Sequence, residues 1–272
     1  MELTFGAVPH TDDGQTRLLL AEFCERWSQH SNTRVLPHRA PSPGSLQAAF
    51  RRGRVHLAWV SPTLFLLSDA FSPAVPFASA VREGASQYNG VLFVREDSSI
   101  RSAESLRGSR VAWVAPTSAA GYLMPRLALA KLGLNPTELF ASEAFLDTHG
   151  AVARAVAQGS ADVGATFALF DDANPAGTLR RAGFDGIEDL DARVVLGSSP
   201  IPSDLIVASH HVPPWIRGNL AIALRNLSDD GSYKELFAAL FGSEGYREHT
   251  PAALDGLARD LSVARERGLW TG

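Results

Sequence analysis

The chain has 272 residues, of which 45% are hydrophobic and 20% charged. This balance indicates one large or two ordinary folded domains and excludes a disordered chain. Its 25 basic and 29 acidic side chains give a formal net charge of −4, which disfavours a nucleic-acid-binding protein. The single cysteine, Cys24, excludes an internal disulfide framework and a cysteine-rich zinc site.

The N-terminal segment, residues 1–5, has neither the basic start nor the long apolar stretch of a secretory signal. If the native chain begins here, this predicts a cytoplasmic protein; if a leader was removed, an exported one. Residues 55–81 are nearly uncharged, but Pro62, Pro73 and Pro76 would break a membrane-spanning helix there. We therefore interpret this stretch as buried strand, helix and strand, and expect no membrane span.

Strand and helix patterns alternate from the start of the chain. The first third predicts strands at residues 3–8, 35–36, 55–60 and 74–81, and helices at 15–29, 45–52 and 62–67. The run at 55–60 is mostly apolar and β-branched, as expected for a parallel strand covered on both faces.

The same alternation continues to the C-terminus. It predicts strands at residues 88–94, 110–114, 161–165, 194–196 and 205–208, and helices at 124–132, 151–157, 213–227, 233–240 and 252–267. This pattern predicts an α/β protein with mixed sheets flanked by helices. Linker-like joints at 82–86 and 197–203 predict two lobes joined by two crossovers. Lobe 1 comprises residues 1–84 and 198–272, and lobe 2, residues 85–197, is inserted into it.

The segment from Val111 to Pro125 has a strand, a turn of small residues and the start of a helix. Pro125 has no N–H group and fits only the first turn of a helix, which predicts a helix beginning near Gly121 or Tyr122. Residues 117–121 then form a loop with free amides at a helix N-terminus, where anions bind. Simple N-capping by Thr117 or Ser118 is the alternative interpretation.

Several segments together resemble the phosphate/phosphonate-type substrate-binding proteins of ABC transporters. They are Gly53 to Pro62, Tyr88 to Ser98, Leu106 to Ala112, Thr117 to Pro125, Leu132 to Pro136, His149 with Ala155 to Gly164, and Ile201-Pro202. They cover most of the chain in the family's order. The resemblance implies a two-lobed type 2 periplasmic-binding-protein fold that closes on a small ligand, without cofactor, metal or catalytic residue.

The resemblance also implies roles for individual residues. Tyr88 would donate a hydrogen bond to the ligand, His149 would donate a second, and Ser61 would face the cleft between the lobes. An oxyanion would lie in the loop and first helical turn formed by Thr117, Ser118, Ala119, Ala120, Gly121 and Tyr122. Two further candidates, Thr166 and His10, are chosen only for their positions, at the end of a strand and just after one. Each would either line the cleft or be an ordinary strand or loop residue without a role in binding.

The chain departs from the family in this loop, which usually carries serine, threonine and serine before its glycine. Here the matching residues are Ser118, Ala119 and Ala120, so two hydroxyl groups are missing. Each hydrogen bond to a charged group contributes about 1.5–3 kcal/mol, so this loss favours either a weakly held phosphonate-like anion or a less charged organic ligand. Asp162, at a helix-to-strand turn, would hold the turn together or face an amine on the ligand.

Three functions remain open from the sequence. The first is non-catalytic binding of a small, anionic, phosphate- or phosphonate-like ligand for uptake, with an ABC permease as partner and the protein itself a monomer. The second is a ligand-sensing domain coupled to a signalling domain, and the third an enzyme on the same fold. The sequence has no phosphate-binding Walker loop, dinucleotide glycine motif, nucleophile elbow or His-Glu-x-x-His motif, which disfavours the enzyme.

Overall fold

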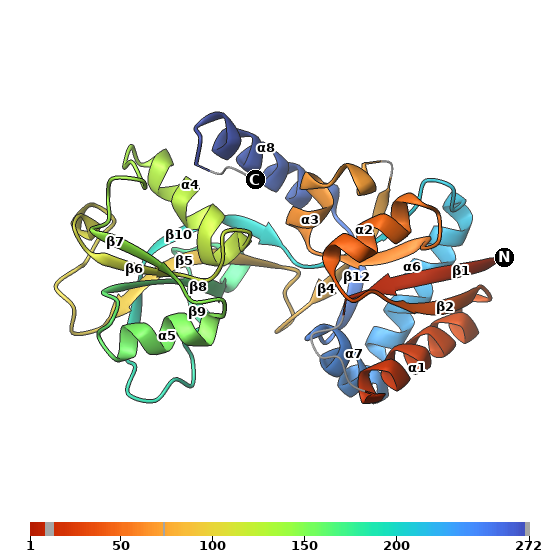
Figure 1. Cartoon of the computed structure of the whole chain (residues 1–272). Helices are drawn as coiled ribbons and strands as arrows, with labels where there is room; N and C mark the ends of the chain where they lie inside the picture. Colours follow the sequence, from red (N-terminus) through yellow and green to blue (C-terminus); the bar gives the residue numbers. More distant parts are fainter. Residues whose placement is uncertain (9–13, 73, 270–272) are drawn as a thin grey trace. The chain divides into compact units, whose positions relative to one another are not determined.

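A computed structural model describes residues 1–8, 14–72 and 74–269 of the chain (Figure 1). The chain divides into two compact units, Met1–Ser86 with Pro202–Pro251, and Gln87–Ile201 with Ala252–Gly272. Among the described residues, no helix has the length and apolar character needed to cross a membrane.

The first unit is built on a mixed sheet with strand order β12-β4-β11-β3-β1-β2. Its strands are β1 (Glu2–Ala7), β2 (Arg34–Arg39), β3 (Leu57–Val60), β4 (Val75–Val81), β11 (Leu205–Ala208) and β12 (Gly245–Glu248). The parallel strands β1, β2 and β3 are followed by an antiparallel part, in which β11 pairs with β3 and β4, and β12 pairs with β4.

Helices cover both faces of this sheet. They are α1 (Gly14–Ser31), α2 (Pro43–Arg51), α3 (Pro62–Leu67), α6 (Pro214–Asp229) and α7 (Lys234–Phe241). Adjacent residues of β1 show the two faces: the ring of Phe5 packs on Phe23 of α1 with centroids 5.5 Å apart, whereas Gly6 lies against Leu46 of α2. Alternation of side chains along a strand explains this division.

The second unit has the strand order β10-β5-β8-β6-β7, with β9 paired to β8. Its strands are β5 (Gln87–Arg95), β6 (Arg110–Trp113), β7 (Ser142–Phe145), β8 (Val163–Phe170), β9 (Leu179–Ala182) and β10 (Ala192–Pro202). Strand β6 is parallel to β7 and β8, and β5 is antiparallel to β8.

Two apolar clusters, one on each face, hold the second unit together. Val91 and Phe93 of β5 belong to the cluster that contains α5 (His149–Ala157), and Leu92 and Val94 to the cluster that contains α4 (Met124–Lys131). Both units are thus mixed sheets flanked by helices, which confirms the predicted fold class.

The last helix, α8 (Pro251–Glu266), groups with the second unit, whereas the sequence analysis assigned residues 252–272 to lobe 1. Two polar contacts with α4 explain the difference. Lys131 Nζ lies 2.6 Å from Asp260 Oδ1, and Arg267 donates a hydrogen bond to the carbonyl of Ala130. The chain therefore passes between the units three times, at residues 86/87, 201/202 and 251/252, and not twice as predicted.

Sequence patterns missed three short strands, β7, β9 and β12. All four residues of the edge strand β7 are exposed, so no apolar alternation marks it. Several bounds also differ. Helix α5 begins at His149 because Thr148 caps it, the strand predicted at 161–165 runs from Val163 to Phe170, and the strand predicted at 194–196 runs from Ala192 to Pro202.

Candidate functional site

The candidate site lies at one end of the strands of the second sheet. The parallel strands β6, β7 and β8 all finish at this end of the sheet, and the antiparallel strand β5 begins there, with Asn89 opposite Ala168. Strand order thus brings the segments after β6 and β7 to the start of β5. Predicted site residues Tyr88, Ser118 and His149 come from these three segments.

The loop after β6 ends in an N-cap. Ser118 Oγ accepts a hydrogen bond from the amide of Gly121 at 3.0 Å, and the carbonyl of Ser118 accepts one from Leu123 at 3.0 Å. The second bond spans five residues, so residues 119–123 form a wide π-helical turn ahead of α4. Helical structure therefore begins at Ala119, not near Gly121 or Tyr122, because the cap at Ser118 starts the turn two residues earlier.

Amide groups are left unpaired at the start of this turn. Among the described residues, the N–H groups of Ala119 and Ala120 have no protein acceptor, whereas that of Gly121 is bound to Ser118 Oγ. Unpaired amides and the positive end of the helix dipole favour an anion at this position. N-capping by Ser118 and an anion-binding turn are therefore compatible, although the sequence analysis treated them as alternatives.

Glycine allows the turn to pack directly on β5. A Cβ atom on Gly90 would lie 2.8 Å from the carbonyl oxygen of Ala120 and 2.9 Å from Cδ of Pro125. On the other side of the turn, a Cβ atom on Gly121 would overlap Val114. Sequence reasoning did not single out Gly90, although a glycine inside a strand often marks close approach of another segment.

A buried cation supports the turn. The side chain of Arg126 is 5% exposed, and its Nη1 lies 3.0 Å from Glu143 Oε2, which also accepts a hydrogen bond from Trp113 Nε1. The guanidinium carbon of Arg126 lies 4.9 Å from the ring centroid of Tyr122, and that ring also packs against Phe145. The structure thus gives the ring of Tyr122 a packing partner in Arg126.

His149, the first residue of α5, contacts β8. Its Nδ1 lies 2.9 Å from Thr166 Oγ1, and its ring packs edge-on against Phe167. Burial of the ring lowers the pKa of His149 from its ordinary value of 6.5. Thr166 itself has no exposed surface.

The start of β5 is held by a polar network that the sequence analysis missed. Tyr88 is half-buried, and the next residue, Asn89, is fully buried and donates from Nδ2 to the carbonyl of Ser198 at 2.8 Å. The amide of Gly90 donates to Ser198 Oγ. These bonds join β5 to β10 and fix the strand that carries Tyr88.

The remaining predicted residues are Ser61, His10 and Asp162. Ser61, in the first unit, is the N-cap of α3 and accepts a hydrogen bond from Leu64 at 3.2 Å. His10 lies outside the described residues. Asp162 Oδ1 lies 2.7 Å from Arg110 Nη2, and Asp162 Oδ2 accepts the Arg110 amide, as expected for the turn-holding alternative.

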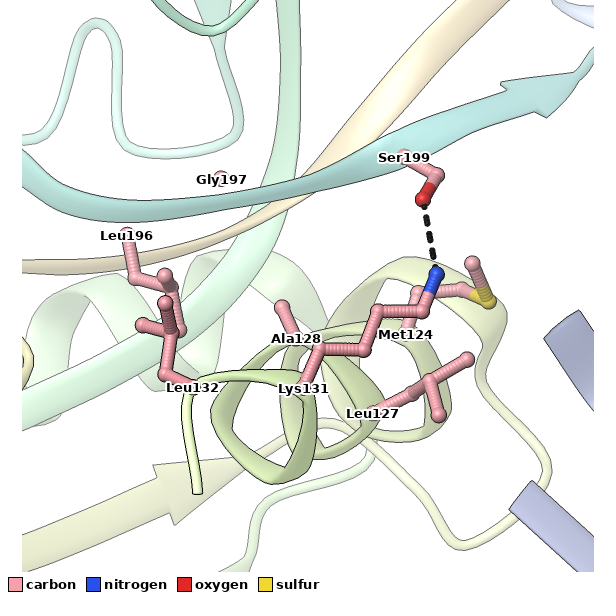
Figure 2. A pocket seen from close by; sticks show the side chains of 8 residues that line it. All are labelled: Met124, Leu127, Ala128, Lys131, Leu132, Leu196, Gly197 and Ser199. Carbon is pink, nitrogen blue, oxygen red and sulfur yellow. Dashed lines mark hydrogen bonds between the residues drawn. The ribbon is translucent and has the colours of Figure 1, made fainter. Parts of the chain in front are cut away.

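A pocket of about 200 Å³ lies elsewhere in the second unit, between α4 and β10 (Figure 2). Its lining is mostly apolar, and Lys131 crosses it to reach Ser199 Oγ at 3.3 Å (Figure 2). Because Lys131 is also paired with Asp260, it offers no uncompensated charge to an anion. Across the described ranges, no three His, Cys, Asp or Glu side chains are arranged to hold a metal ion.

Comparison with solved structures shows the fold. XAC2383 of Xanthomonas citri bound to ATP is 21% identical with a TM-score of 0.72, and the match covers 97% of this chain and 98% of that one. PhnD1 of Prochlorococcus marinus in complex with methylphosphonate is 16% identical with a TM-score of 0.65, covering 98% of both chains. The binding protein PA3383 of an ABC phosphonate transporter from Pseudomonas aeruginosa is 20% identical with a TM-score of 0.64, covering 95% and 84%.

These matches confirm the predicted periplasmic-binding-protein fold. A family model described as the periplasmic substrate-binding protein of a phosphonate ABC transporter matches residues 5–254. This match extends over both units and includes the turn after β6 and the start of α5. The chain belongs to the family of periplasmic phosphonate-type substrate-binding proteins of ABC transporters.

Proposed function

We propose that this protein binds a small anion with a phosphonate or phosphoryl group at residues 117–121 and delivers it to an ABC permease. The family supplies the transport role, and its members work with a permease on the periplasmic side of a membrane. The ligand class is inferred from one observation: the backbone N–H groups of Ala119 and Ala120, at the N-terminus of the turn, are unpaired among the described residues.

The chemistry of the turn suits an oxyanion with several oxygens. Two backbone N–H groups and the hydroxyl hydrogen of Ser118 can each donate to a different oxygen, and the helix dipole adds favourable potential. Each charge-assisted bond contributes about 1.5–3 kcal/mol, so two or three suffice for specific binding. Methylphosphonate in PhnD1 and ATP in XAC2383 share the phosphorus oxyanion, which supports this class over a carboxylate.

Binding without catalysis is the second part of the proposal. Cys24 is 1% exposed in the first core, and burial raises the pKa of its thiol to about 12, which disfavours a nucleophilic thiolate. The hydroxyl of Thr166 is hydrogen-bonded to His149 but has no exposed surface, which disfavours attack on a substrate. We infer a monomeric periplasmic binding protein with no nucleic-acid partner, in keeping with its net charge of −4.

Calorimetric titration with methylphosphonate, phosphate, methanesulfonate, ATP and acetate tests this proposal. Ala119→Pro removes one amide donor; Ala119 is the first residue after the N-cap, where proline is tolerated, and Ser118 already has the extended conformation (φ −73°, ψ 119°) that precedes proline. Ala119→Ser keeps the amide and is the matched control.

We expect a phosphorus oxyanion to bind, Ala119→Pro to weaken that binding at least about tenfold, and Ala119→Ser to retain or improve it. Thermal unfolding of each variant without ligand controls for folding. The proposal is wrong if no phosphorus oxyanion binds, or if Ala119→Pro binds as tightly as the wild type.

A further inference from the structure

We propose that Thr166 is a positioning residue that donates its hydroxyl hydrogen to His149 Nδ1 and thereby holds the imidazole as the neutral Nε2–H tautomer. In this form His149 presents a fixed hydrogen-bond donor to the ligand. The tautomer itself follows from the contacts of Thr166, and its use in anion binding rests on the function proposed above.

The direction of the hydrogen bond follows from the surroundings of Thr166. Its side chain is fully buried, and among the described residues Nδ1 of His149, 2.9 Å away, is the partner of its Oγ1. If Nδ1 carried the proton and donated to Oγ1, the hydroxyl hydrogen of Thr166 would be buried without an acceptor. An unsatisfied buried donor costs about 1–3 kcal/mol. When Thr166 donates instead, the hydroxyl hydrogen and the Nδ1 lone pair are both satisfied.

The second ring nitrogen is left to make outside contacts. Nε2 has no hydrogen-bond partner among the described residues and is not one of the buried unpaired polar atoms, so it reaches solvent. In the neutral imidazole the proton is on one nitrogen only, so a lone pair at Nδ1 places the proton on Nε2. Burial lowers the pKa of His149 from its ordinary value of 6.5. The ring is therefore neutral at pH 7.5.

Glycine and an aromatic ring keep this geometry in place. A Cβ atom on Gly183, which follows β9, would overlap Thr166 Oγ1, so only glycine leaves room for this hydroxyl position. The amide of Gly183 donates to the carbonyl of Phe167, and the Phe167 ring packs edge-on against His149 with centroids 5.1 Å apart. Gly183 thus leaves room for the hydroxyl of Thr166, and Phe167, the next residue of β8, packs against the ring of His149.

A fixed Nε2–H group has a consequence for specificity. A fully deprotonated oxyanion can accept a hydrogen bond from this N–H group. The alternative tautomer would present a lone pair at Nε2 and repel the same oxyanion. Because the wrong tautomer is disfavoured before binding, the ligand does not have to shift that equilibrium.

Long-range ¹H–¹⁵N correlation spectra of the imidazole rings in the ligand-free protein at pH 7.5 test the tautomer directly. The His149 signals are assigned by their absence in His149→Gln. We expect the pattern of a protonated Nε2 and an unprotonated Nδ1. A predominantly protonated Nδ1, an imidazolium ring, or rapid exchange between tautomers would overturn the proposal.

Variants test the part played by Thr166. Thr166→Ser keeps the hydroxyl and should keep the tautomer, whereas the isosteric Thr166→Val should give mixed tautomers and bind methylphosphonate about tenfold more weakly. Retention of both the Nε2–H pattern and the affinity in Thr166→Val would overturn the proposal. If Thr166→Val does not fold, the wild-type spectrum decides alone. Failure of any phosphorus oxyanion to bind, with the Nε2–H pattern present, would contradict the proposed function and not the tautomer.

Discussion

Gly90 of β5 and Ala120 of the π-helical turn approach so closely that a Cβ atom on Gly90 would lie 2.8 Å from the Ala120 carbonyl oxygen. The same atom would lie 2.9 Å from Cδ of Pro125. Neither contact involves the far end of a flexible side chain, so the turn itself would have to move to make room. The position of the unpaired amides of the turn thus depends on one glycine of a neighbouring strand.

Gly90→Ala should therefore destabilise the protein by about 1–3 kcal/mol, as overpacking does, and weaken oxyanion binding because the turn is displaced. Urea unfolding and calorimetric titration with methylphosphonate measure the two effects. Gly218→Ala in α6 is the matched control, since open space surrounds Gly218 and alanine is the better helix former by about 0.5–1 kcal/mol. Equal stability and affinity in Gly90→Ala and wild type would show that the turn is not held by this contact.

The Arg126–Glu143 pair should be important for stability. Glu143→Ala leaves the guanidinium of Arg126, with a side chain 5% exposed, without its carboxylate, and should cost about 3–5 kcal/mol. The double variant Arg126→Met with Glu143→Ala should recover part of this loss, because no buried charge remains. A double-mutant cycle on urea unfolding measures the coupling between the two residues.

Replacement of the exposed ion pair partner Arg34 by methionine is the control for this cycle. The side chains of Arg34 and Glu2 are 72% and 51% exposed, so Arg34→Met should change stability by less than about 1 kcal/mol. If Glu143→Ala and Arg34→Met lose similar amounts of stability, the buried Arg126–Glu143 pair contributes no more than an exposed ion pair, which would contradict this prediction.

The contribution of Asp162 to stability should depend on pH. Hydrogen bonds from Arg110 hold the pKa of Asp162 below its usual value. A carboxyl whose folded pKa is depressed stabilises the fold above its unfolded pKa, about 3.9, and loses this contribution as the pH falls through the folded pKa. The difference in Tm between wild type and Asp162→Asn should thus be largest near neutral pH and shrink below about pH 4.

Asp255→Asn provides the comparison for Asp162, because Asp255 is exposed and has no ion-pair partner among the residues described. Its Tm difference from wild type should stay small across the same pH range. A difference for Asp162→Asn that does not change between neutral pH and pH 2.5 would contradict the role of the Arg110 contact.

Cys24 should be unreactive in the folded protein. Burial raises the pKa of its thiol to about 12 and leaves the residue 1% exposed, so thiolate is scarce and reagent access is blocked. At pH 8 a thiol reagent should label wild type only at the rate of unfolding, and should label an added thiol in Gln29→Cys, an exposed position of α1, at once. Rapid labelling of Cys24 in native buffer would mean that the first core opens readily.

The sequence predicted the parts of the site that depend on local chemistry. The strand before Val114, the capping role of Ser118 and a helix start ahead of Pro125 all follow from residues adjacent in the chain. Close contacts between distant segments could not be predicted in this way. The approach of Gly90 to Ala120, the bond between Thr166 and His149, and the contacts of α8 with α4 all depend on how strands and helices pack, which local patterns do not encode.

Amide spectra of the ¹⁵N-labelled protein during titration with methylphosphonate show whether the backbone amides of the turn after β6 bind a phosphorus oxyanion. We predict the largest downfield shifts at Ala119 and Ala120, with the Gly121 amide changing less because Ser118 Oγ already accepts its hydrogen bond. Saturable binding that leaves the amides of Ala119 and Ala120 unshifted would contradict this role of the turn.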